Sequence, residues 1–92
     1  MKSALQAVLQ SVASMFDGPL EIAVQTAAAL VGQLDLPDGD ERWGKVGELV
    51  AATIDDIRDA RDLDAGTQMQ VRLAAERRMH LQLRELGLID RG

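Results

Sequence analysis

Cysteine and tyrosine are absent from this 92-residue chain, and its only aromatic residues are Phe16 and Trp43. Without cysteine there is no disulfide, no thiolate nucleophile and no Cys-ligated metal. The apolar residues are mostly alanine, leucine and valine, which suit close helix packing better than the aromatic-rich packing of sheets. These absences exclude a disulfide scaffold and favour an all-α fold.

Long apolar runs are missing as well. The longest, from Leu20 to Leu36, is crossed by five polar residues and falls short of the ~20 residues that a membrane helix needs. Polar residues also follow Lys2 closely and interrupt any signal-peptide core. We therefore expect no membrane segment and a cytoplasmic location, which would be the host cytoplasm if the chain is phage-encoded.

Four segments with helical apolar periodicity are separated by three compact breaks, which predicts one helical domain over residues 1–92. The composition, 47% apolar and 27% charged, is typical of a globular chain. The expected helices cover about residues 3–16, 19–33, 41–63 and 67–86. Because the connections between them are short, the chain is expected to form a small four-helix antiparallel bundle.

The expected helix starts carry capping signals, in which side chains satisfy free backbone N–H groups. The pairs with capping-box spacing are Ser3 with Gln6, Asp38 with Glu41 and Thr67 with Gln70. Asp40 alone is the alternative cap for the third helix.

Glycines mark two of the expected helix boundaries. Gly18 with Pro19 ends the first helix and opens the second. Gly87 fits the left-handed position just past the fourth helix, with Leu88 falling back onto Leu83.

The second helix is apolar nearly all round and is therefore expected at the centre of the bundle. Gly44 and Gly47 cost about 1 kcal/mol each relative to alanine inside a helix, and we expect a close helix contact beside Trp43 in return. The predicted core residues are Leu5, Val12, Phe16, Leu30, Trp43, Val46, Val50, Ile54, Ile57, Met79 and Leu83.

Catalytic equipment is not found in the sequence. A nucleophilic enzyme needs an activated side chain beside a base, and the single histidine, His80, has no serine, threonine or cysteine at helical spacing. Neither Gly-rich phosphate motif occurs. Glu76 and His80 lie one turn apart, but with Arg72 they form an ordinary helix-surface set rather than a di-metal site. The chain is therefore expected to be no enzyme and to need no metal or cofactor.

Acidic residues in the connection after the second helix do not change that expectation. Asp35, Asp38, Asp40 and Glu41 lack the register of an EF-hand calcium loop, and a solvated turn with helix caps explains them.

The net charge of −5 is unevenly spread, and acidic side chains follow one side of the third helix. The acidic face consists of Glu48, Asp55, Asp56, Asp59 and Asp62. One interpretation is a docking face for a basic protein that normally holds nucleic acid, because carboxylates can occupy contacts made for phosphates. The other is a solvated face partly neutralised by Arg58 and Arg61.

The last helix is mildly basic. The basic face consists of Arg77, Arg78, His80 and Arg84. These residues could grip phosphates or an acidic protein groove, or they could form salt bridges to the acids of the third helix. Without interleaved aromatic residues, direct nucleic-acid binding is less favoured.

Two families of similar size do not fit. Acyl carrier proteins need an Asp-Ser-Leu attachment site, and no Asp-Ser occurs here. The WXG secreted proteins carry Trp-x-Gly in the turn of a long hairpin, whereas Lys45 stands two residues after Trp43.

The sequence thus predicts a module that binds another protein, in its most concrete form a small acidic inhibitor or modulator of a basic, nucleic-acid-handling partner. By analogy of class, small acidic helical proteins of phage type, anti-CRISPR proteins among them, act in this way. One alternative is a structural or oligomerisation subunit. Leu88 and Ile89 are expected to be exposed, and exposed apolar side chains favour contact with another chain. Another is a nucleic-acid binder that uses the basic face.

Overall fold

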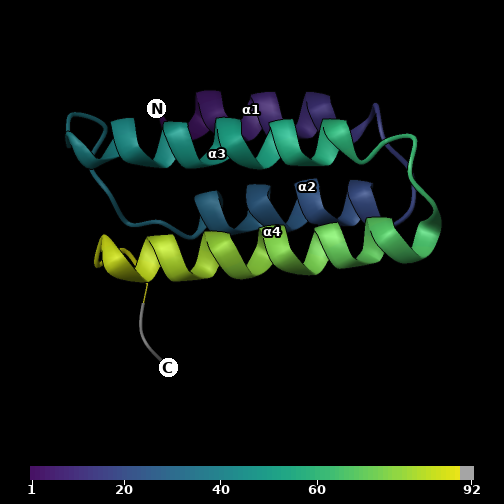
Figure 1. Ribbon diagram of the computed structural model, residues 1–92. Coiled ribbons are helices and arrows are strands. Elements are labelled where there is room, and N and C mark those ends of the chain that lie inside the picture. Colours follow the sequence, from purple (N-terminus) through teal and green to yellow (C-terminus); the bar gives the residue numbers. More distant parts are fainter. Residues whose placement is uncertain (90–92) are drawn as a thin grey trace.

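The computed structural model describes residues 1–89, and within them it contains four helices and no strand. The helices are α1 (Lys2–Ala13), α2 (Pro19–Gly32), α3 (Arg42–Asp59) and α4 (Ala65–Glu85). Each helix runs antiparallel to the one before it (Figure 1). The prediction of an all-α, four-helix antiparallel bundle is confirmed; residues 90–92 of the predicted domain lie outside the described residues.

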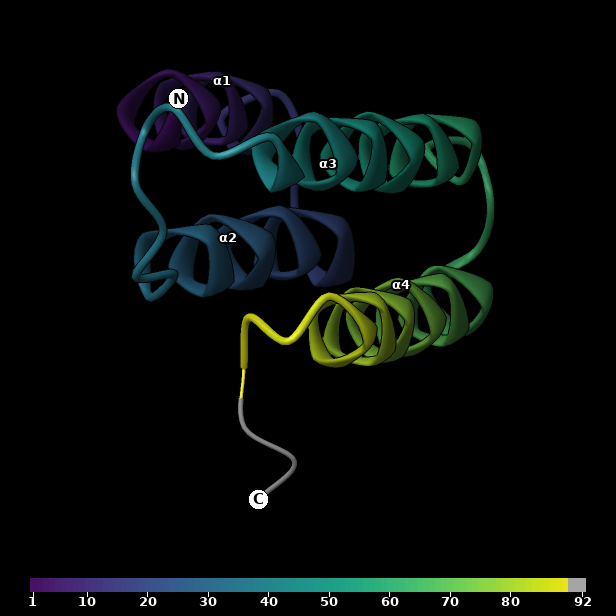
Figure 2. The same cartoon turned by 90° about the vertical axis from the view of Figure 1, so that its left-hand side faces the viewer.

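The bundle consists of two helical hairpins laid side by side. Viewed from one end, α1 and α2 stack on one side and α3 and α4 on the other (Figure 2). The second helix contacts all three others, whereas α1 and α4 occupy diagonal corners and share no contact within the described chain. Since α2 and α4 are neighbours that run in the same direction, the α2–α3 connection crosses the bundle diagonally (Figures 1 and 2).

The core lies mainly on α2 and α3, each of which buries seven side chains. Three of the seven buried α2 residues are alanines, which let the neighbouring helices approach closely. Nine of the eleven predicted core residues are buried, while Leu5 and Val12 are partly buried and pack against that core from α1. The sequence also missed several fully buried residues, among them Leu9, Val24 and Val31.

Two predicted helix ends lie three or four residues beyond the ends in the structure, and the end of the second helix agrees to within one residue. The first helix stops at Ala13 rather than 16, because the chain tightens into a turn in which Phe16 N donates to the Ala13 carbonyl. The third stops at Asp59 rather than 63, again in successive tight turns, with Leu63 N donating to Ala60. The second ends at Gly32.

The predicted capping boxes at Ser3 and Thr67 are wrong. The first helix begins at Lys2 without a side-chain cap, and Gln6 instead reaches across to α2. The fourth begins at Ala65 because Asp64, in extended backbone, accepts hydrogen bonds from the backbone N–H and hydroxyl of Thr67.

Polar side chains from other helices hold the C-terminal ends of α2, α3 and α4. The last carbonyl groups of a helix have no partner within it, so a donor from elsewhere both satisfies them and fixes the helix in place. The three bonds join Lys2 to the Leu34 carbonyl, Gln68 to the Ala60 carbonyl and Arg42 to the Leu86 carbonyl, at 3.1, 3.1 and 3.3 Å. The two helices of each hairpin are thus tied together at their ends as well as through the core.

The end of α4 has the predicted glycine cap. Gly87 adopts a φ of 73°, its N–H donates to Arg84, and Leu88 N donates to the Leu83 carbonyl at 2.9 Å. This pair of bonds is the Schellman motif. Leu88 and Ile89, expected to be exposed, are partly buried against the core because this cap folds the chain back.

Gly44 and Gly47 do not make the close helix contact that the sequence led us to expect. A Cβ atom added at either position would meet nothing within 4 Å, since both lie on the outer side of α3. The close approach occurs instead at Gly32 of α2, where an added Cβ would run into the Gln6 amide.

Candidate functional site

The acidic face follows the outer side of α3 as an exposed row. Glu48, Asp55 and Asp59 share that side, and at 1.5 Å per residue the row from Glu48 to Asp59 is about 16 Å long. Asp62, placed by the sequence on the same helix, lies in the turn after it because α3 ends at Asp59. It remains exposed and extends the row beyond the helix.

Basic neighbours neutralise this row only in part. Lys45 lies 3.8 Å from Glu48 and Arg58 lies 3.6 Å from Asp55, and all four side chains are largely exposed. Exposed pairs of this kind contribute about 0–1 kcal/mol and are screened by salt. Both carboxylates therefore remain accessible to a partner.

The turn after α3 is less neutralised than the sequence predicted. Arg61, expected to offset the acids, lies over the Phe16 ring at 5.0 Å from its centroid. Within residues 1–89, Asp59 and Asp62 form no ion pair. The strongest unbalanced negative charge of the acidic face thus lies at this end.

Small residues surround the carboxylates of α3. Gly44, Ala51 and Ala52 are exposed, and Gly47 is partly exposed on the same helix. No large side chain from these positions screens Glu48 or Asp55. A flat or convex surface can therefore approach the helix backbone closely while it contacts the acids.

The fifth acidic residue, Asp56, has a different role. Its carboxylate lies 2.7 Å from Arg78, which also donates to the hydroxyl of Thr53 at 3.3 Å. Thr53 is only 1% exposed and donates in turn to the Leu49 carbonyl. This network joins α3 to α4, so Asp56 and Arg78 serve the packing of the two helices.

The predicted basic face is consequently divided. Arg78 makes the interhelical salt bridge that the sequence offered as one explanation, and His80 is partly buried. Arg77 and Arg84 point outward on α4, and neither forms an ion pair with any other residue of the described range. Only two of the four residues are therefore available together for an external ligand.

Two further charged pairs stabilise the fold. Arg72 bonds Glu76 at 3.0 Å along α4, and no group of three metal-ligating side chains occurs among residues 1–89. The side chain and backbone N–H of Arg42 donate to Asp40, and these hydrogen bonds lower the pKa of Asp40 from its ordinary value of 3.8 to about 2. Asp40, the alternative cap in the sequence analysis, thus anchors the start of α3.

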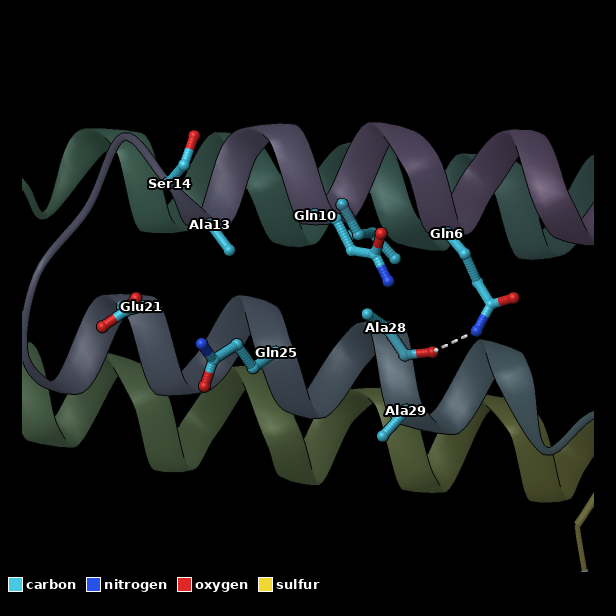
Figure 3. A pocket seen from close by; sticks show the side chains of 9 residues that line it. Gln6, Gln10, Ala13, Ser14, Glu21, Gln25, Ala28 and Ala29 are labelled. Carbon is cyan, nitrogen blue, oxygen red and sulfur yellow. Dashed lines mark hydrogen bonds between the residues drawn. The ribbon is translucent and has the colours of Figure 1, made fainter.

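A hollow of about 520 Å³ lies between α1 and α2 (Figure 3). Its walls carry the amides of Gln6, Gln10 and Gln25, and Gln6 donates to the Ala28 carbonyl at 3.4 Å. The Ser14 hydroxyl at its rim donates to its own helix, to the Ser11 carbonyl. This hollow was not predicted from the sequence; the signal for it is the position of Gln6 and Gln10 on α1, opposite the small residues of α2.

Two further hollows lie between α3 and α4, at opposite ends of their shared surface. One, of about 290 Å³, is lined by Leu63, Val71 and Ala74, with Asp59 and Arg78 beside them. The other, of about 340 Å³, is lined by Glu48, Leu49, Ala52, Gln82 and Leu86, with Lys45 at its edge. Both combine an apolar floor with charged residues of the acidic face.

The described helices include none that is long and apolar enough to cross a membrane. No family profile, curated protein or solved structure matches the chain.

Proposed function

We propose that this protein is a non-enzymatic interaction module that docks the acidic face of α3 onto a basic surface of another protein. The observation that supports it is the exposed row of Glu48, Asp55 and Asp59, continued by Asp62, with small residues and the paired Lys45 and Arg58 beside it. Asp56 is left out of this docking set because Arg78 already holds it.

The chemistry of the row suits a partner that handles nucleic acid. Arginine and lysine bind carboxylates through the same charge-assisted hydrogen bonds that they make with phosphates. A rod of carboxylates about 16 Å long can thus occupy several backbone contacts of a nucleic-acid site at once. Inhibition would follow from competition for that site.

Gly44 and Gly47 give this proposal independent support. Each costs stability inside a helix, and neither is required by any contact within the described structure. A partner surface that presses close to α3 is the use that we assign to them. The small acidic inhibitors made by phages, anti-CRISPR proteins included, are the class of protein that we place beside this one by analogy.

A competition assay tests the proposal. The wild-type protein, a D55K/D59K/D62K variant and a D17K/D35K/D38K control would each serve as bait in an extract of the cell that encodes the chain. The control changes the charge equally, away from α3. We expect a nucleic-acid-binding protein that is retained by the wild type and the control, is lost by the α3 variant, and releases labelled nucleic acid when the wild type is added.

Equal retention by all three baits would contradict docking through the acidic face. A partner that keeps its nucleic acid when bound would contradict competition.

A further inference from the structure

The charges of the α3–α4 hairpin are nearly balanced in number but separated in space. The two helices carry seven basic and six acidic residues, whereas the rest of the described chain carries two basic and eight acidic. The acids of α3 form one outward row, and Arg77 and Arg84 form another on α4. The hairpin therefore presents both signs of charge on one surface without the net repulsion of the other half.

The two rows are in register. The Arg78–Asp56 ion pair places residue 78 of α4 beside residue 56 of α3, and the helices run in opposite directions. Counting from that pair, we compare positions along the helix axis. Arg77 lies within two residues, or about 3 Å, of the axial positions of both Asp55 and Asp59. Arg84 lies within about 3 Å of the level of Glu48 by the same count.

A two-fold axis parallel to the helices would bring the two rows of opposite charge together, because such a rotation leaves the position of each residue along the helix axis unchanged. If a second copy is turned about such an axis in front of the α3–α4 surface, its α3 lies opposite α4 of the first copy at the same level. Arg77 then faces Asp55 and Asp59 of the second copy, and Arg84 faces Glu48 of the second copy. Symmetry repeats each contact, as in any isologous dimer, and the assembly closes at two chains.

The surface between the two rows is apolar enough for the centre of such an interface. Leu63 and Leu81 are 47% and 45% exposed, although both are large and hydrophobic. The hollows of about 290 and 340 Å³ lie on the same surface, beside the small residues Ala74 and Ala52. Of the charged residues that also line these hollows, Arg78 is paired with Asp56 and Lys45 with Glu48, and Asp59 belongs to the acidic row, so the apolar side chains can form the centre of an interface with the charge rows at its rim.

The available area is also sufficient. With 18 and 21 residues, α3 and α4 are about 27 and 31 Å long, and side by side they are about 20 Å wide. Their common outer surface projects to about 600 Å², and its ridges expose more than that. Counted over both copies, the projected surface is about 1,200 Å², which is the lower end of the range for stable interfaces.

We infer that a second copy of this chain docks on the α3–α4 surface to form a two-fold dimer held at its rim by the two rows of opposite charge. This goes beyond the proposed docking of a basic partner and does not depend on it. Because the dimer covers Asp55 and Asp59, self-association and binding of a basic partner through α3 exclude one another.

Sedimentation velocity on the purified full chain, from micromolar to several hundred micromolar, tests the inference. We expect a concentration-dependent dimer that weakens as salt screens the rim charges. R77E/R84E and D55R/D59R should each weaken self-association by more than about tenfold, since each places like charges opposite one another. An equimolar mixture of R77E, which leaves Arg84 opposite Glu48, and D55R/D59R should restore a mixed dimer, visible as the intermediate mass in native mass spectrometry.

A D17R/D35R variant, which changes as much charge outside this surface, is the control and should dimerise at least as well as the wild type. Circular dichroism would show that every variant keeps its helices. A monomer at all concentrations, a dimer that both swaps leave intact, or a mixture that fails to associate would each overturn the inference.

R77E/R84E also separates the two proposals. It removes the dimer but leaves the acidic face whole, so binding of a basic partner should persist or increase. Loss of the partner in D55K/D59K/D62K but not in R77E/R84E would support the proposed function whatever the outcome for the dimer.

Discussion

The two hairpins of this bundle differ in how they use their surfaces. In α1 and α2, Lys2 and Glu21 are the only charged residues, and both α2 and the inner side of α1 are devoted to packing. In α3 and α4, thirteen residues are charged, and several exposed positions are taken by glycine or alanine. Both hairpins thus supply buried side chains to the core, and the second also presents the charged side chains that an external partner can recognise.

The contacts within each hairpin follow the same division. Between α1 and α2 the approach is close at Gly32, which gives room to the Gln6 amide. Between α3 and α4, the polar network of Thr53, Asp56 and Arg78 forms part of the interface. These hydrogen bonds and the ion pair fix how far one helix is shifted along the other, and the alignment of the two charge rows depends on that shift.

Truncation of a core side chain in the first hairpin should have the largest effect. Leu9 of α1 is fully buried, so L9A should lower the free energy of unfolding by about 2–5 kcal/mol, through lost burial and the cavity left behind. Leu73 of α4 is largely exposed, and L73A should change the free energy of unfolding by no more than about 0.5 kcal/mol. Urea unfolding followed by circular dichroism measures both, and similar losses would show that the burial of Leu9 does not stabilise the core.

The glycines of α3 should give the next largest effect, with the opposite sign. G44A/G47A should stabilise the protein by about 1–2 kcal/mol in total, because alanine favours the helix and both positions face open space. The same variant should bind the proposed partner more weakly, since two methyl groups would stand between it and α3. Greater stability with unchanged binding would show that the glycines have no part in docking.

The wrong expectation for these glycines shows what the sequence could and could not predict. Periodicity predicted the four helices and nine buried core residues, because burial of one helix side leaves a local pattern. It could not tell whether a glycine on a helix faces a neighbour or solvent, which depends on how the helices are arranged. The diagonal α2–α3 connection is equally invisible to a local pattern.

Capping and charge pairing were predicted only in part for the same reason. Ser3 and Gln6 have the spacing of a capping box, yet Gln6 finds a better partner on α2, 22 residues away. Arg78 and Arg77 are adjacent in sequence, but only Arg78 faces α3 and pairs with Asp56. The candidate acidic residues were recognised by type, whereas their availability became known only from the three-dimensional arrangement.

Removal of the buried hydroxyl in the α3–α4 joint should have a moderate effect. In T53V the side chain keeps its shape but no longer accepts from Arg78 or donates to the Leu49 carbonyl. We expect a loss of about 1 kcal/mol, the usual net value of such hydrogen bonds. Unfolding of T53V, R78M and the double variant forms a cycle, and additive losses would show that the two residues are not coupled.

The smallest effect is expected from acid, at Asp40, which lies in the connection between the two hairpins. Hydrogen bonds from Arg42 hold the pKa of Asp40 at about 2 in the folded chain, below its ordinary 3.8. The stability that this pair contributes is therefore complete above pH 4 and disappears as the pH falls from about 4 to about 2.

D40N, which lacks the charge throughout, should be less stable than the wild type at pH 7 and should approach it near pH 2. Asp64, whose pKa is lowered by hydrogen bonds from Thr67, caps α4 inside the second hairpin and gives the matched case. In D64N the difference from the wild type should likewise fade in acid.

Because Arg42 also holds the Leu86 carbonyl of α4, D40N should loosen both the start of α3 and the end of α4. Amide hydrogen exchange that speeds up at α3 alone would show that Asp40 anchors one helix rather than linking two.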